Sequence, residues 1–148
     1  MIRRARDQDI DQIVDLVELF LKETAYSNRE LGQDREHISR IVWTCLRQGY
    51  IWLGFSQGQA VGLLIATREP ILWQPKIHCL RELIWYVHPS ARSSSIGGRL
   101  FVEYQRTADD LRARQEIEGY FTTRMSSTAP IDYERRGFRL TEMTYLKE

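Results

Sequence analysis

The sequence predicts a mixed α/β (α+β) fold, in which helices flank a mostly antiparallel sheet. Apolar residues recur at helical spacing in three long segments, and β-forming runs lie between these segments. A strand, a helix and another strand follow one another at 77–125, and such a crossover joins two parallel strands. The expected order of elements is therefore β-α-α-β-β-β-α-β-α-β, in one domain that covers residues 1–148.

Two helices are expected before most of the sheet, after a short first strand at residues 2–5. Asp7 and Asp9 offer N-caps for the first helix, whose apolar positions are Ile10, Ile13, Val14, Val17, Phe20 and Leu21. Asp34 offers an N-cap for the second helix, which Gly49 ends and whose apolar positions are Ile38, Ile41, Val42 and Leu46. Both helices are amphipathic, so each can cover one face of a sheet.

Three strands and a loop are expected in the middle of the chain. The β-forming runs at 50–55 and 60–67 flank the turn sequence SQGQ, so they predict an antiparallel hairpin. Two prolines in REPILWQPK predict a loop at 68–76. The long apolar run IHCLRELIWYV predicts a central strand at 77–87.

The last third of the chain is expected to hold two helices and two strands. A helical stripe begins at Ile96 and continues with Leu100, Phe101, Tyr104, Ala108 and Leu111. EIEGYFTTRM predicts a strand at 116–125, and the alternating FRLTEMTYLK predicts a last strand at 138–147. Between them, APIDYERRG predicts a short helix at 129–137 that ends at Gly137.

Composition restricts the partners of the chain. Its 21 basic and 20 acidic side chains give a formal net charge of +1, so no long-range field attracts nucleic acid or an anionic membrane. Neither partner is expected. Cys45 and Cys79 lie alone in apolar segments, which predicts reduced thiols in the core. No apolar run approaches the ~18 residues of a membrane span, and the N-terminal segment is polar, so a cytoplasmic location is expected.

The stretch WYVHPSARSSSIGGRL, residues 85–100, places three serines and two glycines where a helix must begin. Two adjacent glycines in a first helical turn cost about 1 kcal/mol each relative to alanine. The first N–H groups of a helix have no internal partner and carry the positive end of its dipole, so residues 93–98 can hold a phosphate group. An ordinary flexible loop with a poor cap is the alternative, and this stretch alone does not decide between them.

Two motifs resemble those of a known family. The arrangement V-x-P-x-x-R-x-x-x-x-G-x-x-L is formed here by Val87, Pro89, Arg92, Gly97 and Leu100. It resembles the coenzyme-binding motif of the GNAT superfamily of N-acyltransferases. The family's C-terminal signature is similar to A-x-x-x-Y-x-x-x-G-F, formed by Ala129, Tyr133, Gly137 and Phe138. The order of elements agrees with the family over the whole chain. ELIWYVHPSAR further resembles small phage-type GNAT proteins, and for a phage-encoded protein the location would be the host cytoplasm.

The resemblance implies acetyl-CoA as the acyl donor, bound in a wedge between residues 85–87 and 121–123. The coenzyme-binding residues that it implies are Trp85, Tyr86, Val87, Arg92, Ser93, Ser94, Ser95, Ile96, Gly97, Gly98 and Ser126. Two of these positions depart from the family, which usually has glycine at residue 95 and often asparagine at residue 126. These departures leave an alternative open, a degenerate acyl-CoA-binding or protein-interaction module without turnover.

The resemblance also suggests two catalytic residues. The family commonly places its base on the strand before the coenzyme motif, where Glu82 is the one carboxylate within 77–87. An ion pair of Glu82 with Arg81 or Arg92 is the alternative. Tyr133 matches the family's proton donor to the departing thiolate, and a packing role in the core is its alternative. The three histidines show no metal-ligand spacing, so no metal is expected.

The predicted function is transfer of an acetyl group from acetyl-CoA to an amine. The sequence does not decide whether the acceptor is a small molecule or a protein, or whether the chain forms a homodimer. Acetylation of aminoacyl-tRNA is disfavoured, because an RNA substrate normally calls for a basic face and this chain offers scattered arginines.

Overall fold

The structure is a computed structural model that describes residues 1–24, 34–123 and 131–143. Its strands are β1 (Ile2–Arg4), β2 (Gly49–Ser56), β3 (Gln59–Ile71), β4 (Gln74–Val87) and β5 (Gly119–Phe121). Its helices are α1 (Ile10–Glu23), α2 (Arg35–Gln48) and α3 (Ile96–Ala113). Three short 3-10 turns accompany them, η1 (Asp7–Asp9), η3 (Pro89–Ala91) and η4 (Glu134–Arg136).

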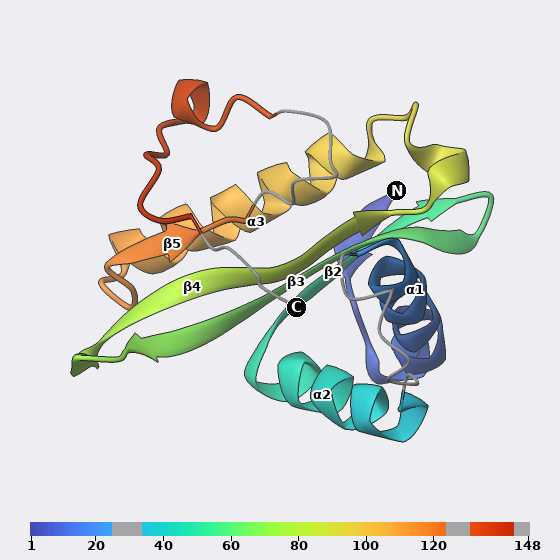
Figure 1. Cartoon of the computed structure of the whole chain (residues 1–148), viewed down its shortest axis with the longest axis horizontal. Helices are drawn as coiled ribbons and strands as arrows, with labels where there is room; N and C mark the ends of the chain where they lie inside the picture. Colours follow the sequence, from blue (N-terminus) through green and yellow to red (C-terminus); the bar gives the residue numbers. More distant parts are fainter. Residues whose placement is uncertain (25–33, 124–130, 144–148) are drawn as a thin grey trace.

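The strands form one sheet in the order β1-β2-β3-β4-β5. Neighbouring strands are antiparallel except β4 and β5, which are parallel and joined through α3. Helices α1 and α2 lie on one face of the sheet and α3 on the other (Figure 1). The predicted fold class and the single parallel pair are confirmed.

Alternate residues of the central strands supply two separate cores. On β3, Leu63 and Ile65 belong to the cluster beneath α1 and α2, whereas Leu64 and Ala66 belong to the cluster beneath α3. All four side chains are at most 2% exposed. Because both faces of the sheet are covered here, the strands read as continuous apolar runs in the sequence.

The predicted loop at 68–76 is wrong. β3 continues to Ile71 and β4 begins at Gln74, so the two strands extend as one long hairpin beyond the helices (Figure 1). Pro70 lies beyond Thr67, where the pairing of β3 with β2 ends. Pro75 lies before Cys79, where the pairing of β4 with β5 begins. Proline is tolerated in such edge positions because no ladder hydrogen bond is lost on the free side.

The C-terminal prediction is correct only in part. Within the described residues, the helix expected at 129–137 is the single turn η4, closed by Gly137 at φ 84°. β5 is shorter than the strand expected at 116–125, and residues 138–143 form no strand. Phe138 instead packs its ring on Tyr120 and Phe101, with centroids 5.2 and 5.9 Å away. Side-chain packing over α3 therefore replaces strand pairing in this part.

A buried ion pair joins β1 to the start of α1. Asp9 is 2% exposed and stands at the N-cap of α1, but its carboxylate does not cap that helix. It accepts hydrogen bonds from the Arg3 guanidinium at 2.7 and 2.8 Å and from the Arg6 N–H at 2.7 Å. The bonds from Arg3 hold the pKa of Asp9 below its usual range.

Asp9→Asn should lower the free energy of unfolding at pH 7 by about 2–3 kcal/mol, because it leaves Arg3 without its charged partner. A lowered folded-state pKa stabilises the fold above the ordinary aspartate pKa and ceases to do so as the pH falls through the lowered value. The deficit of the variant should therefore shrink in acid. Urea unfolding at several pH values measures it, with Asp11→Asn in the exposed first turn of α1 as the control.

Candidate active site

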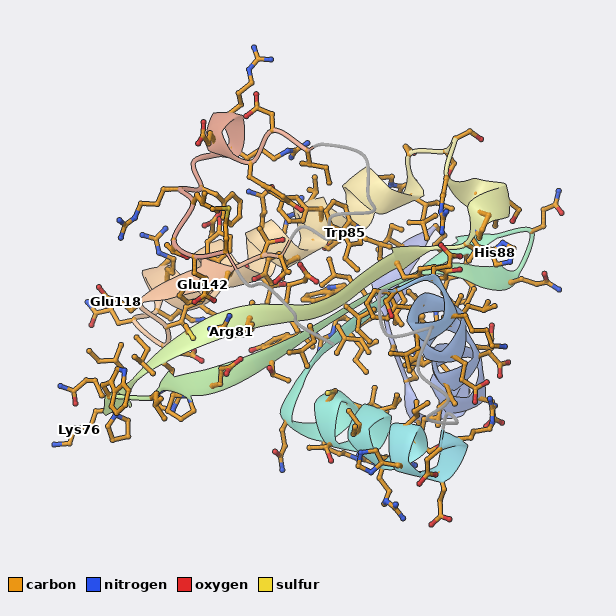
Figure 2. The ribbon with its side chains drawn as sticks, in the orientation of Figure 1. Lys76, Arg81, Trp85, His88, Glu118 and Glu142 are labelled. Atoms are coloured by element: carbon orange, nitrogen blue, oxygen red, sulfur yellow. The ribbon has the colours of Figure 1, made fainter. Side chains whose placement is uncertain are left out.

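A cavity of about 310 Å³ lies where the end of β4 meets the start of α3. Six lining residues are predicted coenzyme contacts: Trp85, Val87, Arg92, Ser94, Gly97 and Gly98. The other lining residues are Phe101, Ile131 and Arg136. Figure 2 shows Trp85 between β4 and α3, and Lys76 at the opposite end of β4. The fold thus brings most of the predicted coenzyme residues to one place.

The other predicted coenzyme residues do not line this cavity. Tyr86 is buried in the core beneath α1 and α2, on the opposite face of the sheet. Ile96 is buried in the core beneath α3. Ser93 and Ser95 are exposed in the turn that precedes α3. Ser126 lies outside the described residues.

The first turn of α3 supplies unpaired backbone donors to the cavity. The Ile96 N–H donates to the Ser94 hydroxyl at 3.3 Å. Among the described residues, the N–H groups of Gly97 and Gly98 find no acceptor. Since these donors stand at the positive end of the helix dipole, the cavity is suited to an anionic group.

The two glycines of this turn serve different purposes. A Cβ on Gly97 would lie 3.3 Å from Cγ2 of Val87, so the absence of a side chain lets α3 approach β4 closely. A Cβ on Gly98 would meet no atom within 4 Å, so there the side of the cavity is open. Ser95 has φ −79°, an ordinary backbone conformation, and therefore suffers no strain where the family usually has glycine.

The parallel pairing of β4 with β5 covers three residue pairs, from Cys79–Gly119 to Arg81–Phe121. Directly after it, Oε2 of Glu82 accepts hydrogen bonds from the Thr123 N–H and the Thr122 hydroxyl, both at 2.9 Å. The side chain thus takes the place of a backbone partner. In the described part of the chain, the edge of β4 beyond Arg81 has no strand beside it. Apart from the Val87 carbonyl, which accepts from Arg92 Nε, and the Glu82 backbone, which contacts Tyr104, this edge is available to a ligand.

A β-bulge in β4 decides which way Glu82 faces. Ile65 pairs with Ile84 and the next residue, Ala66, pairs with Glu82, so Leu83 is the extra residue. Residues directly opposite each other share one face of a sheet, and Ala66 belongs to the core beneath α3. Glu82 therefore lies on the face of α3, as Trp85 does. Regular alternation would have placed it on the other face.

Burial dominates the electrostatics of Glu82. The residue is 5% exposed, and desolvation raises its pKa above the usual range, although the two threonine hydrogen bonds favour the charged form. The alternative of an ion pair is not realised, because Arg81 pairs with Glu69 and Arg92 with Glu23. Oε1 accepts no hydrogen bond from the described residues and is not fully enclosed. Glu82 is therefore suited to exchange a proton.

Tyr133 lies beside the cavity without lining it. Its half-buried ring packs against Phe101, which lines the cavity, and against Phe138, with centroids 6.0 and 5.9 Å apart. Trp85 stacks on the same Phe101 at 4.8 Å. Both interpretations of Tyr133, proton donor and packing residue, are compatible with this position.

Sequence reasoning missed several residues of the site. Phe101 and Arg136 complete the cavity, and the Arg136 guanidinium lies over the Phe101 ring, 5.5 Å from its centroid. Phe101 has only a helical apolar pattern, which does not distinguish a cavity wall from core. Glu23 was missed because nothing in the sequence links it to Arg92, 69 residues away.

Three further expectations concern metals, membranes and thiols. No cluster of three His, Cys, Asp or Glu in residues 1–24, 34–123 and 131–143 could hold a metal ion. Across the same residues, none of the helices has the length and apolar character to cross a bilayer. Cys45 and Cys79 are free and buried, as predicted.

No protein-family model and no curated protein matches the chain. Its fold is similar to that of a predicted acetyltransferase with acetyl-CoA from Clostridium acetobutylicum, with a TM-score of 0.74 and 16% identity over 99% of this chain and 95% of the other. A possible acetyltransferase from Clostridium difficile 630 is 22% identical, with a TM-score of 0.73 over 100% and 95%.

A third similar structure is an aminoglycoside acetyltransferase from an uncultured soil metagenomic sample in complex with sisomicin. Its TM-score is 0.63 at 15% identity, over 100% of this chain and 96% of the other. The chain therefore has the fold of the GNAT acetyltransferases. Its resemblance to phage-type members stays a prediction.

Gly98→Val should weaken the binding of acetyl-CoA by about tenfold or more, because the side chain would project into the open side of an anion site. Isothermal titration calorimetry measures the dissociation constant, and a thermal melt verifies that the variant is folded. Gly119→Val is the matched control, since a Cβ there also meets no atom within 4 Å and the residue lies outside the cavity. Unchanged affinity in Gly98→Val would place the coenzyme elsewhere.

Proposed function

We propose that the chain transfers an acetyl group from acetyl-CoA to an amine. The proposal rests mainly on one arrangement. The unpaired N–H groups of Gly97 and Gly98 border the same cavity as the end of β4, and β4 separates from β5 at the buried carboxylate of Glu82. Two neighbours in fold support it. One is a structure with acetyl-CoA, and another is an aminoglycoside acetyltransferase with sisomicin bound.

The coenzyme would bind through three parts of the cavity. Its pyrophosphate would accept hydrogen bonds from the Gly97 and Gly98 N–H groups and lie near the Arg92 guanidinium. Its pantetheine amides would pair with the open edge of β4 beyond Arg81. The stacked rings of Trp85 and Phe101 form an apolar wall between these polar regions.

Glu82 would accept the proton of the attacking amine, directly or through a water. A free lysine amine has a pKa near 10.4, so at neutral pH it must lose a proton before it can attack. A carboxylate with a raised pKa is a better base for this purpose than an ordinary glutamate, because its pKa lies closer to the working pH. Oε1, which no described donor occupies, is the atom that would take the proton.

Two protons leave the nitrogen and one reaches the sulfur. Before attack, the protonated amine loses one proton to Glu82; the neutral nitrogen then forms a bond to the thioester carbonyl carbon, the carbon–sulfur bond breaks, and the nitrogen loses its second proton to solvent. The departing thiolate takes a proton, for which Tyr133 is the proposed donor. The products are an N-acetyl amide and coenzyme A, and solvent restores both side chains.

The alternative of a binding module without turnover has lost part of its basis. It rests on the departures at Ser95 and Ser126, but Ser95 adopts an unstrained backbone. Thiol release from acetyl-CoA, measured with small polyamines, aminoglycosides and peptides as acceptors, tests the proposed function. Tight binding of acetyl-CoA with no turnover on any of these amines would favour the module instead.

Glu82→Gln should lower turnover by about 10²-fold or more and remove the acidic limb of the pH–rate profile, because an amide cannot accept the proton. Binding of acetyl-CoA should persist. The exposed Glu118, which precedes β5, offers the control variant Glu118→Gln. An acidic limb that survives in Glu82→Gln would remove Glu82 from the mechanism.

The same variant has a stability signature. A raised folded-state pKa means that the folded chain disfavours the charged carboxylate, so this group stabilises the fold less as the pH rises through its raised pKa. Glu82→Gln should therefore unfold at a higher temperature than the parent at neutral pH. This advantage should disappear in acid, where the parent is protonated in both states.

Tyr133→Phe should lower turnover by about 10²-fold while the dissociation constant of acetyl-CoA stays within about twofold, because only the hydroxyl is removed. Tyr120→Phe is the matched control: its hydroxyl donates to Asp109 at 3.3 Å and its ring packs on the same Phe138. Full turnover in Tyr133→Phe would leave the ring a packing role alone.

A further inference from the structure

We infer that Glu23 is a positioning residue, which orients Arg92 for the coenzyme's phosphate groups; this inference rests on the proposed function. Glu23 is the last residue of α1, and Arg92 lies in the turn that leads to α3. The two side chains form an ion pair across the end of β4. No sequence motif assigns a role to Glu23.

Three contacts fix the Arg92 side chain. Its Nε donates to the Val87 carbonyl at 2.9 Å, its Nη2 donates to Oε2 of Glu23, and its Cζ lies 5.7 Å from the centroid of the Tyr86 ring. Arg92 also lines the cavity, so the side chain that these contacts fix borders the space a ligand would occupy. Because the side chain is 49% exposed, it would sample several rotamers without these contacts, and a ligand would have to immobilise it.

Tyr86 fixes the carboxylate of Glu23, which in turn binds Arg92. Its hydroxyl donates to Oε1 of Glu23 at 2.8 Å, so each carboxylate oxygen has a separate partner. Burial raises the pKa of Tyr86 to about 12, and the hydrogen bond to Glu23 adds to this, so the hydroxyl remains a donor at neutral pH. Tyr86, predicted to contact the coenzyme, thereby connects to the cavity through Glu23 and Arg92.

The helix that carries Glu23 gains nothing from this charge. A carboxylate in the last turn of a helix faces the negative end of the dipole, which is unfavourable. Among the described residues, its favourable interactions reach other parts of the fold, at Tyr86, Arg92 and His88. The placement is therefore explained by those contacts and not by α1 itself.

Two roles of Glu23 predict opposite effects on affinity. A carboxylate near an anion site repels the anion, so a bystander would weaken binding, and its neutralisation would leave affinity unchanged or improve it. A positioning residue has the opposite effect, because without it Arg92 must be ordered by the ligand. The sign of the change in Glu23→Gln therefore separates the two roles.

The test measures the dissociation constant of acetyl-CoA for the parent, Glu23→Gln, Arg92→Gln and the double variant. Glu23→Gln should weaken binding by about threefold to tenfold, a range set by a half-exposed pair. In the Arg92→Gln background the same substitution should have no effect or should improve binding. Turnover at saturating acetyl-CoA should stay at the parent value, so that the KM for acetyl-CoA rises and kcat does not.

Two further variants complete the design. Tyr86→Phe removes one donor from Glu23 and should weaken binding in the same direction by a smaller factor. Glu36→Gln breaks an exposed ion pair with Arg40 on α2, away from the cavity, and should leave affinity unchanged. Thermal melts verify that all variants are folded.

Unchanged or tighter binding in Glu23→Gln would overturn the inference, as would an equal loss in the Arg92→Gln background. Failure of the proposed function has a different signature: either the parent binds acetyl-CoA without turnover, and the dissociation constants still test the inference, or the parent itself binds no acetyl-CoA. In that case inorganic pyrophosphate is the probe for the same four proteins. Pyrophosphate affinities without the predicted dependence on Arg92 would overturn the inference as well.

Discussion

One extra residue in β4, Leu83, determines which side chains meet the space between β4 and α3. Without this bulge, Glu82 would alternate onto the face of α1 and α2, where it would compete with the core for space. With it, the carboxylate reaches Thr122 and Thr123 at the point where β5 leaves β4. Glu82, which directly follows the last parallel pair, thereby lies at the edge of β4 that a ligand can use.

The position of α3 depends on a second constraint, the absence of side chains at glycines facing its first turn. A Cβ on Gly54 would lie 2.4 Å from Cγ2 of Ile96, and one on Gly62 would lie 2.7 Å from the same atom. Ile96 therefore anchors the start of α3 on β2 and β3, while Gly97 lets the helix approach β4. The N–H groups that face the cavity are in this way held by packing, before any ligand binds.

The sequence predicts the helices and the central strands because their apolar residues recur with periods of 3.6 and 2. It also predicts most of the cavity residues, since they share one short stretch. The sequence does not predict features that depend on distant parts of the chain. The extension at 68–76 depends on which strands lie alongside it, and the direction of the Glu82 side chain depends on a bulge that no residue type predicts. The contact between Glu23 and Arg92 depends on the finished fold.

The pattern of ion pairs, more than the presence of a carboxylate, sets the chemistry of Glu82. Arg81 is its neighbour in the sequence and would lower its pKa as a partner. Arg81 is instead paired with Glu69 and Arg92 with Glu23. Glu82 is left with two neutral threonine donors, so burial outweighs them and its pKa rises.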